Sequence, residues 1–176
     1  MAILPIKLYP HPVLLRRTEP VEQIDDEIRQ LVQDMVDTML HAPGIGLAAN
    51  QVGVSRRLCV IDLSCGQEPG GLHVFINPEI KEATGSQVGE EGCLSFPDIN
   101  LEIERAHLAT VESLGLDGER TTVTVEGLMA RAILHECEHL DGKTFLQHVS
   151  SLKRELIKRQ IRKRISSGDW VEAAAK

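Results

Sequence analysis

Aromatic residues make up only 3% of this 176-residue chain, so its core must be built from aliphatic side chains. Neither Pro nor Gly is abundant enough to indicate disorder. No apolar run approaches the roughly 18 to 20 residues of a membrane span, and residues 1–12 lack the apolar core and cleavage signal of a secreted protein. Because four Cys without a secretory signal are typical of a reducing compartment, we expect a cytoplasmic protein that binds no membrane.

The strongest pattern that is present is His-Glu-x-x-His, formed by His135, Glu136 and His139. It lies in an apolar run, Leu128 to Leu140, that predicts a helix ended by Gly142. Residues four apart share one face of a helix, so both imidazoles can reach one metal ion. The Glu beside them can handle the protons of a metal-bound water. The pattern therefore predicts a metal-dependent hydrolase.

The third metal ligand decides the class of hydrolase. A metzincin would need a third His at the position of Phe145, so that class is excluded. A thermolysin-like protease would use a downstream Glu, for which Glu155 is a weak candidate in a basic segment. Cys93 is the better candidate, because a thiolate and two imidazoles leave a fourth position open for water. A lone Cys is more often a small buried apolar residue, so these residues alone leave the choice open.

Taken with two further segments, the pattern resembles the bacterial peptide deformylases. Gly44 to Gln51 is similar to the family's Gly-x-Gly-x-Ala-Ala-x-Gln signature, and Glu91 to Ser95 to its Glu-Gly-Cys-x-Ser block. His135 to Gly142 resembles its metal helix, and the opening Tyr9 to Leu14 also fits. The resemblance implies an enzyme that removes the formyl group from the N-terminal formylmethionine of nascent polypeptides and releases formate.

The resemblance also implies the roles of the site residues. It makes Cys93 the third metal ligand and Glu136 the residue that takes a proton from the attacking water. The amide of Gln51 and the backbone N–H of Leu94 would donate to the oxyanion. The family implies Fe²⁺ as the ion in the cell, and two His with one Cys also suit Zn²⁺, Ni²⁺ or Co²⁺.

Substrate-binding residues follow partly from position along the chain. Two glycines would let the backbone pass close to a ligand, and residues one turn before the first metal-binding His could line a pocket for the methionine side chain. The stem of an Arg there would supply apolar surface. These candidates are Gly44, Ile45, Gly46, Arg131 and Ala132, with Leu128 and Phe96 as further candidates.

The sequence departs from the family pattern at three positions. Glu138 stands where Asp is usual, Leu134 where Gln is common, and Asn100 where many bacterial members carry a basic residue. Glu138 keeps the charge and could still pair with a cation such as Arg105. None of these changes touches a predicted ligand or the catalytic Glu.

Periodicity indicates one α+β domain over residues 1–176, with antiparallel or mixed β-sheets packed around the central metal-binding helix and a C-terminal helix after it. An amphipathic helix is predicted from Asp25 to Leu40, and the last helix from Leu152 to about Ile165. The predicted strands are Leu58 to Leu63, His73 to Ile76, Leu101 to Glu112 and Thr121 to Val125, the last two joined by a turn at Asp117-Gly118.

Positive charge gathers in the basic C-terminal segment 151–167, where seven Lys and Arg against one Glu leave a net charge of +6. Because the whole chain has a net charge of −7, the rest of the chain carries −13. Such a helix is usually a solvated face. The alternative is docking on ribosomal RNA near emerging nascent chains, through salt-dependent phosphate contacts; no DNA partner is expected. The seven residues are Lys153, Arg154, Lys158, Arg159, Arg162, Lys163 and Arg164.

Two other classes compete with the deformylase. A metallopeptidase could use the same helix, but it lacks a third ligand of its own. A structural metal protein would need a fourth protein ligand, and none stands out. Cys137 is expected to point away from the metal face into the core, and Cys59 to lie in an apolar strand.

Overall fold

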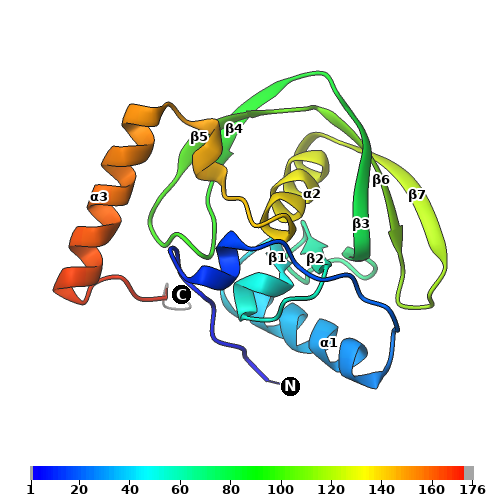
Figure 1. Ribbon diagram of the computed structural model, residues 1–176. Coiled ribbons are helices and arrows are strands. Elements are labelled where there is room, and N and C mark those ends of the chain that lie inside the picture. The colour runs from blue at the N-terminus through cyan, green and yellow to red at the C-terminus, as the bar shows by residue number, and fades with distance from the viewer. Residues whose placement is uncertain (1, 173–176) are drawn as a thin grey trace.

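The computed structural model describes residues 2–172 (Figure 1). Three α-helices, α1 (Asp26–His41), α2 (Gly127–Leu140) and α3 (Ser151–Ser167), lie within these residues. The strands are β1 (Gly46–Ala48), β2 (Leu58–Asp62), β3 (Leu72–Thr84), β4 (Gln87–Glu91), β5 (Leu101–Arg105), β6 (Leu108–Leu114) and β7 (Arg120–Glu126). Short 3₁₀ turns are η1 (Pro12–Leu15), η2 (Ala49–Val52) and η3 (Phe145–His148).

The strands form two antiparallel sheets, which confirms the predicted α+β class. Five strands run in the order β1-β2-β3-β6-β7, and β4 pairs separately with β5. In Figure 1 the strands curve around α2, whereas α3 stands at the left edge of the molecule. The single domain over residues 1–176 stays a prediction, since residue 1 and residues 173–176 lie outside the described part of the chain.

Strand β2 explains how the core is layered, because all five of its residues are buried. Successive side chains of a strand point to opposite faces of the sheet. Leu58 and Val60 pack in one hydrophobic cluster with α1, whereas Cys59 and Ile61 pack in another with α2. The sheet therefore lies between α1 and α2, and the prediction that Cys59 belongs to the core is confirmed.

The helix α2 begins and ends nearly where the sequence predicts. Nine of its residues are buried, including Cys137, which packs against the sheet as predicted. Gly142 follows it with φ of 72°, a left-handed conformation that favours glycine. A Cβ at this position would lie 2.6 Å from the backbone of Arg16. The end of α2 is thus set by a position that only glycine fits.

The other two helices also match their predictions, with clear caps. The Asp25 carboxylate accepts a hydrogen bond from the Ile28 N–H at the start of α1. Ser150 caps α3 in the same way. Only Ile157 and Ile161 of α3 are buried, so this helix touches the core along one narrow stripe. No helix in residues 2–172 combines the length and apolar character needed to cross a membrane.

The predicted strand Leu101 to Glu112 is wrong. Its two halves are β5 and β6, which belong to different sheets. Alternate residues are buried in the same phase in both strands, and no Gly or Pro stands between them, so period-two patterning cannot reveal the break. The sequence reasoning also missed β4 and the second half of β3, because the exposed ends of these strands carry polar residues on both faces.

Candidate metal centre and active site

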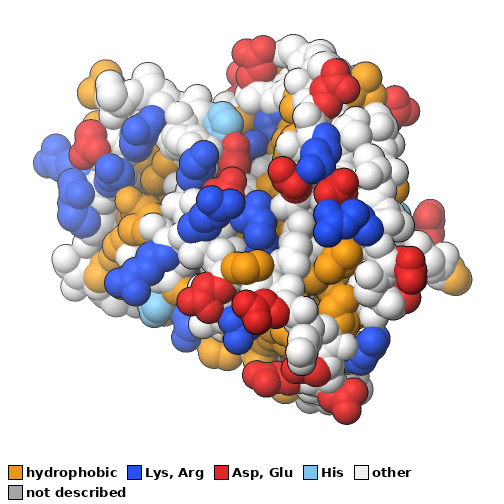
Figure 2. All heavy atoms as spheres, turned by 45° about the vertical axis from the view of Figure 1, so that its right-hand side comes forward, with side chains coloured by type: hydrophobic (Ala, Val, Ile, Leu, Met, Phe, Trp, Pro, Cys, Tyr) orange, Lys and Arg blue, Asp and Glu red, His pale blue; other side chains and the backbone are white. Residues whose placement is uncertain are grey.

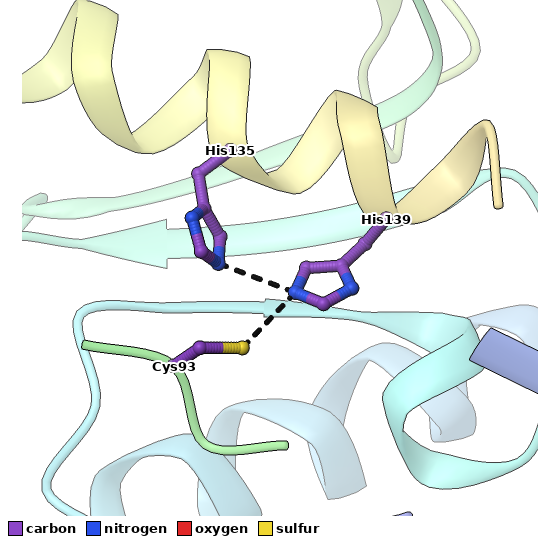
Figure 3. A group of neighbouring side chains, drawn as sticks. All are labelled: Cys93, His135 and His139. Carbon is purple, nitrogen blue, oxygen red and sulfur yellow. Dashed lines mark hydrogen bonds between the residues drawn. The ribbon is translucent and has the colours of Figure 1, made fainter. Parts of the chain in front are cut away.

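Three side chains from two segments converge at the surface of α2. His135 and His139 project from successive turns of the helix toward Cys93, which lies in the loop between β4 and β5 (Figure 3). The Nε2 atoms of the two imidazoles are 3.2 Å apart, and the Cys93 Sγ is 3.2 Å from the His139 Nε2. The three potential ligand atoms all lie within 4.8 Å of one another. The structure thus brings together all three predicted ligands.

The geometry and chemistry of these groups suit a metal ion. Nitrogen and sulfur ligands on a tetrahedral metal, with bonds of about 2.0 to 2.3 Å, lie roughly 3.3 to 3.6 Å apart. The observed separations fall just below that range. Burial, with the nearby His135, lowers the pKa of His139 well below its usual value. This favours the neutral imidazole that binds metals.

Glu91 orients His135 through the ring nitrogen that does not face the other two ligands. Its Oε2 lies 3.0 Å from the His135 Nδ1, which leaves the Nε2 of that ring facing Cys93 and His139. A carboxylate in this position sets the tautomer and direction of a metal-binding imidazole. Glu91 is only 6% exposed, so its charge needs compensation inside the protein.

Two arginines supply that compensation. Arg105 donates to both oxygens of Glu91, and Arg131 Nη1 donates to its Oε1 at 2.7 Å. Burial alone would raise the pKa of the Glu91 carboxyl, but hydrogen bonds from His135 and Arg105 lower it to about 2. Glu91 is therefore a charged, fully engaged group with a positioning role, which the sequence reasoning missed. Its sequence signal was Arg105, which occupies a core-facing position in the alternating strand β5.

The predicted catalytic residue, Glu136, lies in the opposite situation. It is 5% exposed, and its Oε2 has no hydrogen-bond partner within the described residues. Burial raises the pKa of Glu136 to about 7. Gly46 passes so close that a Cβ there would collide with the Glu136 Oε1. The first glycine-rich motif thus makes room for this carboxylate.

The two predicted oxyanion donors lie beside the metal ligands. Gln51 is 2% exposed, and its Oε1 accepts a hydrogen bond from the Ala48 N–H at 2.9 Å. That contact turns the Nε2 toward Ser95 Oγ, 3.2 Å away, and the Cys93 Sγ, 3.7 Å away. Within residues 2–172 the Leu94 N–H donates to no protein acceptor. Both donors are therefore close to the metal site, and the Leu94 N–H is free for a ligand.

A cavity of about 370 Å³ opens onto these groups. Gly44, Ile45, Gly46 and Ala132, all predicted from the sequence, contribute to its wall. Leu128, a further candidate from the sequence, also lines the cavity and is 52% exposed. Other lining residues are Pro43, Glu90, Gly92, Phe96, Pro97, Asp98 and Asn100.

Arg131 also borders the cavity, but its charged group faces elsewhere. Its guanidinium donates to Glu91 and to the Ile103 carbonyl, 3.0 Å away, and the residue is 6% exposed. Arg131 lies one turn before His135, as predicted. Its guanidinium, however, is hydrogen-bonded to Glu91 and Ile103 rather than directed into the cavity.

The departure at Glu138 is accommodated as predicted. The Arg105 guanidinium donates to Oε1 and Oε2 of Glu138 at 2.9 and 3.1 Å. His148, for which the sequence indicated no role, lies 2.7 Å from the Glu138 Oε1. Leu134 is partly buried against the α2 cluster, and Asn100 lines the cavity. The longer Glu side chain bridges Arg105 and His148.

Three converging ligands and a buried carboxylate at the end of a cavity define the class of protein as a metal-dependent hydrolase. The model of the polypeptide deformylase family matches residues 3–155, and the chain belongs to this family. Its resemblance to the peptide deformylases, inferred from three sequence blocks, is thereby confirmed.

Relatives and solved structures agree over nearly the whole chain. The peptide deformylase of Acidobacterium capsulatum is 49% identical over 170 residues, which cover 97% of this chain and 100% of that protein. The crystal structure of a peptide deformylase from Legionella pneumophila has a TM-score of 0.86 at 40% identity, over 94% of this chain and 98% of that one. A peptide deformylase from Ehrlichia chaffeensis in complex with actinonin has a TM-score of 0.85 at 36% identity, over 93% and 98%.

Proposed function

We propose that the deformylase reaction of this chain, the hydrolysis of N-formylmethionyl peptides to formate and a free amine, uses Glu136 to move the protons. The buried and partly unpartnered carboxylate of Glu136, beside three converging ligands, is the observation that carries this proposal. A proton-transfer group works best when its pKa lies near the working pH. Burial places Glu136 in that range.

Cys93, His135 and His139 would hold the divalent metal. When bound, it supplies Lewis acidity, which polarises a carbonyl group and lowers the pKa of water. We propose Fe²⁺ as the ion in the cell, with Zn²⁺, Ni²⁺ and Co²⁺ as alternatives, because two imidazoles and a thiolate suit all four.

The chain's own groups then account for each bond change. Glu136 takes one proton from water as the water oxygen bonds to the formyl carbon. Gln51 Nε2 and the Leu94 N–H donate to the carbonyl oxygen as negative charge develops there. The carbon–nitrogen bond breaks and Glu136 passes its proton to the leaving amine. The other product leaves as formic acid, which loses its remaining proton to solvent and becomes formate.

We propose that the cavity wall binds the formylmethionine end of the peptide. Ala132 and the exposed Leu128 offer apolar surface for an unbranched side chain. Gly44, Ile45 and Gly46 also line the cavity, where the backbone can approach an extended peptide closely. Arg131 supports this wall through its buried pair with Glu91.

The first test is formate release from a formyl-Met tripeptide by protein purified anaerobically with its metal. We expect the wild-type chain to turn over and Glu136→Ala to lose activity while keeping one metal per chain. Cleavage of an internal peptide bond without formate would instead indicate a metallopeptidase. Near-wild-type turnover by Glu136→Ala would remove this residue from the mechanism.

Two cysteines, Cys93 and Cys137, provide a matched test of the ligand set. Cys93→Ala should lose both metal and formate release, whereas Cys137→Ala should keep both, because Cys137 packs against the sheet on the other side of α2. Metal analysis of each variant, after anaerobic purification and after reloading with Fe²⁺ or Zn²⁺, would also identify the ion retained. Retention of full metal by Cys93→Ala would contradict the assignment.

We also propose that the outer face of α3 docks on the ribosome. Lys153, Arg159, Arg162 and Lys163 are exposed on it, and Lys and Arg side chains gather at the left of Figure 2, on the side where α3 lies. The exposed Leu152 and Leu156 interrupt this positive surface with apolar area. Such a surface suits phosphates beside an apolar patch.

Co-sedimentation with ribosomes over a range of salt concentrations tests the docking proposal. Arg159→Glu should weaken binding at low salt and flatten its salt dependence. Arg29→Glu, an equal charge reversal on the exposed face of α1, is the control. Equal binding by the two variants would contradict docking through α3.

We also propose a cytoplasmic location, which agrees with the proposed ribosomal partner. All four cysteines are free thiols in the structure, as expected where disulfides are kept reduced. Fractionation of the source cells, with immunodetection of the protein, tests this location.

A further inference from the structure

One basic residue of α3 turns away from the exposed face and holds the wall of the active-site cavity. Arg164 Nη1 donates to the Pro97 carbonyl at 2.9 Å, and its Nη2 donates to the Asp98 carboxylate at 3.0 Å. Pro97 and Asp98 both line the cavity. The C-terminal end of α3 is thus connected directly to the substrate side of the molecule.

This contact has few substitutes. Among residues 2–172, Arg164 supplies all the hydrogen bonds made by the Pro97 carbonyl and the Asp98 carboxylate. Asp98 has φ of 61°, a left-handed conformation that Asp adopts more readily than most residues but that still has an energetic cost. The guanidinium therefore adds hydrogen bonds from a distant helix to a turn whose backbone hydrogen bonds, Phe96 N–H to the Cys93 carbonyl and Ile99 N–H to the Phe96 carbonyl, are local.

A second connection reaches the same wall from the chain that follows α3. The Arg164 guanidinium lies 4.9 Å from the ring centroid of Trp170, and the Trp170 Nε1 donates to the Tyr9 carbonyl at 2.6 Å. The Tyr9 ring stacks on Phe96 at 4.9 Å, and Phe96 is another residue of the cavity wall. Arg164 thus touches the wall directly and also reaches it through Trp170 and Tyr9.

We propose that Arg164 is a positioning residue for peptide binding, which sets the place of the Phe96–Asp98 wall and hence the affinity for the formylated peptide. The inference rests on the proposed function of the cavity. It separates Arg164 from the other basic residues of α3, since Arg159 and Lys163 are exposed and make no hydrogen bond to the wall within the described residues. The match to the family model ends at residue 155, before Arg164 and Trp170.

Arg164 lies away from the groups that move protons or hold the metal. Its loss should therefore change the binding of the peptide and leave the chemical step alone, because a misplaced wall weakens contacts made equally in the ground and transition states. A role confined to holding α3 in place would instead lower stability without a separate effect on KM.

The experiment compares KM and kcat for formate release from a formyl-Met tripeptide in metal-loaded Arg164→Ala and Arg29→Ala. Arg29 is exposed on α1, so both variants lose one positive charge and their change in net charge is the same. We expect Arg164→Ala to raise KM roughly threefold to tenfold with kcat and metal content unchanged. Arg29→Ala should match the wild type.

Two further variants separate positioning from folding. Arg164→Lys should restore part of the KM, since Lys offers a single point of donation in place of a planar fork. Asp98→Asn keeps a residue that tolerates positive φ and removes the charged partner, so it should raise KM less than Arg164→Ala. Both variants are expected to fold even if Arg164→Ala does not.

The outcomes distinguish this inference from the proposed function. Equal KM values for Arg164→Ala and Arg29→Ala, or a fall in kcat together with loss of metal, would overturn the positioning role alone. If Arg164→Ala does not fold, wild-type KM values in both Arg164→Lys and Asp98→Asn would overturn it. Absence of formate from fully metal-loaded wild-type protein would refute the proposed function and this inference with it.

Discussion

Two buried glutamates near the candidate metal ligands have opposite environments. Glu91 contacts Arg105, Arg131 and His135, and although burial alone would raise its pKa, the hydrogen bonds from His135 and Arg105 hold that pKa at about 2. Glu136 has one oxygen without a partner, and burial raises its pKa to about 7. The two carboxyl groups are buried to the same degree, at 6% and 5% exposure.

The difference shows that burial alone does not determine the state of a carboxylate. A group surrounded by cations stays charged and rigid, which suits the orientation of a metal ligand. A group buried without partners keeps a proton within reach near neutral pH, which suits proton transfer. Environments that push two carboxyl groups apart in this way indicate which one performs the chemistry.

The largest expected effect comes from removing the charge of Glu136 while keeping its shape. Glu136→Gln should lower formate release by at least about a hundredfold, since general acid–base groups contribute this much or more. Metal-free Glu136→Gln should also have a free energy of unfolding, measured in urea at pH 8, that is roughly 1 to 3 kcal/mol higher than that of the wild type. The reason is that the substitution removes an unpartnered buried charge. A less stable variant would contradict the view that this carboxylate is held at a cost to folding.

Glu91→Gln should change the free energy of unfolding in the opposite direction and destabilise the fold. Removing this charge leaves Arg105 and Arg131 buried beside a neutral amide, and breaking a buried ion pair costs about 3 to 5 kcal/mol. Metal affinity, measured by competition with a chelator, should fall roughly tenfold to a hundredfold as His135 loses its partner. Glu90→Gln is the matched control, since Glu90 is exposed on the same strand and should change stability by less than about 0.5 kcal/mol. Similar losses in both variants would contradict the special role of Glu91.

Shortening the outer carboxylate tests how far this charged cluster extends. Glu138→Asp should lose one of the contacts to Arg105 or His148, at a cost of about 1 kcal/mol. Turnover should stay within about twofold of the wild type, because Glu91 still holds His135. A large fall in metal affinity would show that the outer contact orients the ligand as well.

The smallest effect concerns Asp62, a carboxylate held by local hydrogen bonds rather than by buried cations. The Ser64 side chain, the largest cause, and the backbone N–H groups of Ser64 and Gly66 lower the pKa of Asp62 from 3.8, although partial burial opposes them. A carboxyl whose pKa is lower in the folded state stabilises the fold above the unfolded pKa, and this contribution is lost as the pH falls through the folded pKa.

The advantage of the wild type over Asp62→Asn in urea unfolding should therefore be full at pH 6 and shrink as the pH falls below about 3.8. Ser64→Ala should remove part of the same pH dependence. A difference that does not change with pH would show that hydrogen-bond geometry, and not charge, makes Asp62 stabilising.

The sequence predicted those features of the site that depend on local spacing. His135 and His139 could be assigned because four residues make about one helical turn, whatever the helix packs against. Asp25 and Gly142 could be placed because helix ends need caps. Cys93 could be chosen only through the resemblance of its short block to a known family.

Other features could not be read from the chain. The role of Glu91 depends on Arg105 and Arg131, which come from β5 and α2 and meet it only in the folded state. The burial of Gln51, the exposure of Leu128 at the cavity and the contact of Arg164 with Pro97 likewise join distant segments. Periodicity reports one face of one element and does not say which partner covers it.

By itself the sequence determined the family and the helix on which His135 and His139 share one face, because these follow from short patterns and local backbone geometry. Only the tertiary structure decided which carboxylate stays charged. The pKa of a buried group depends on the cations and hydrogen bonds around it, and Glu91 and Glu136 receive theirs from different parts of the fold. The same long-range packing placed the end of α3 against the cavity wall.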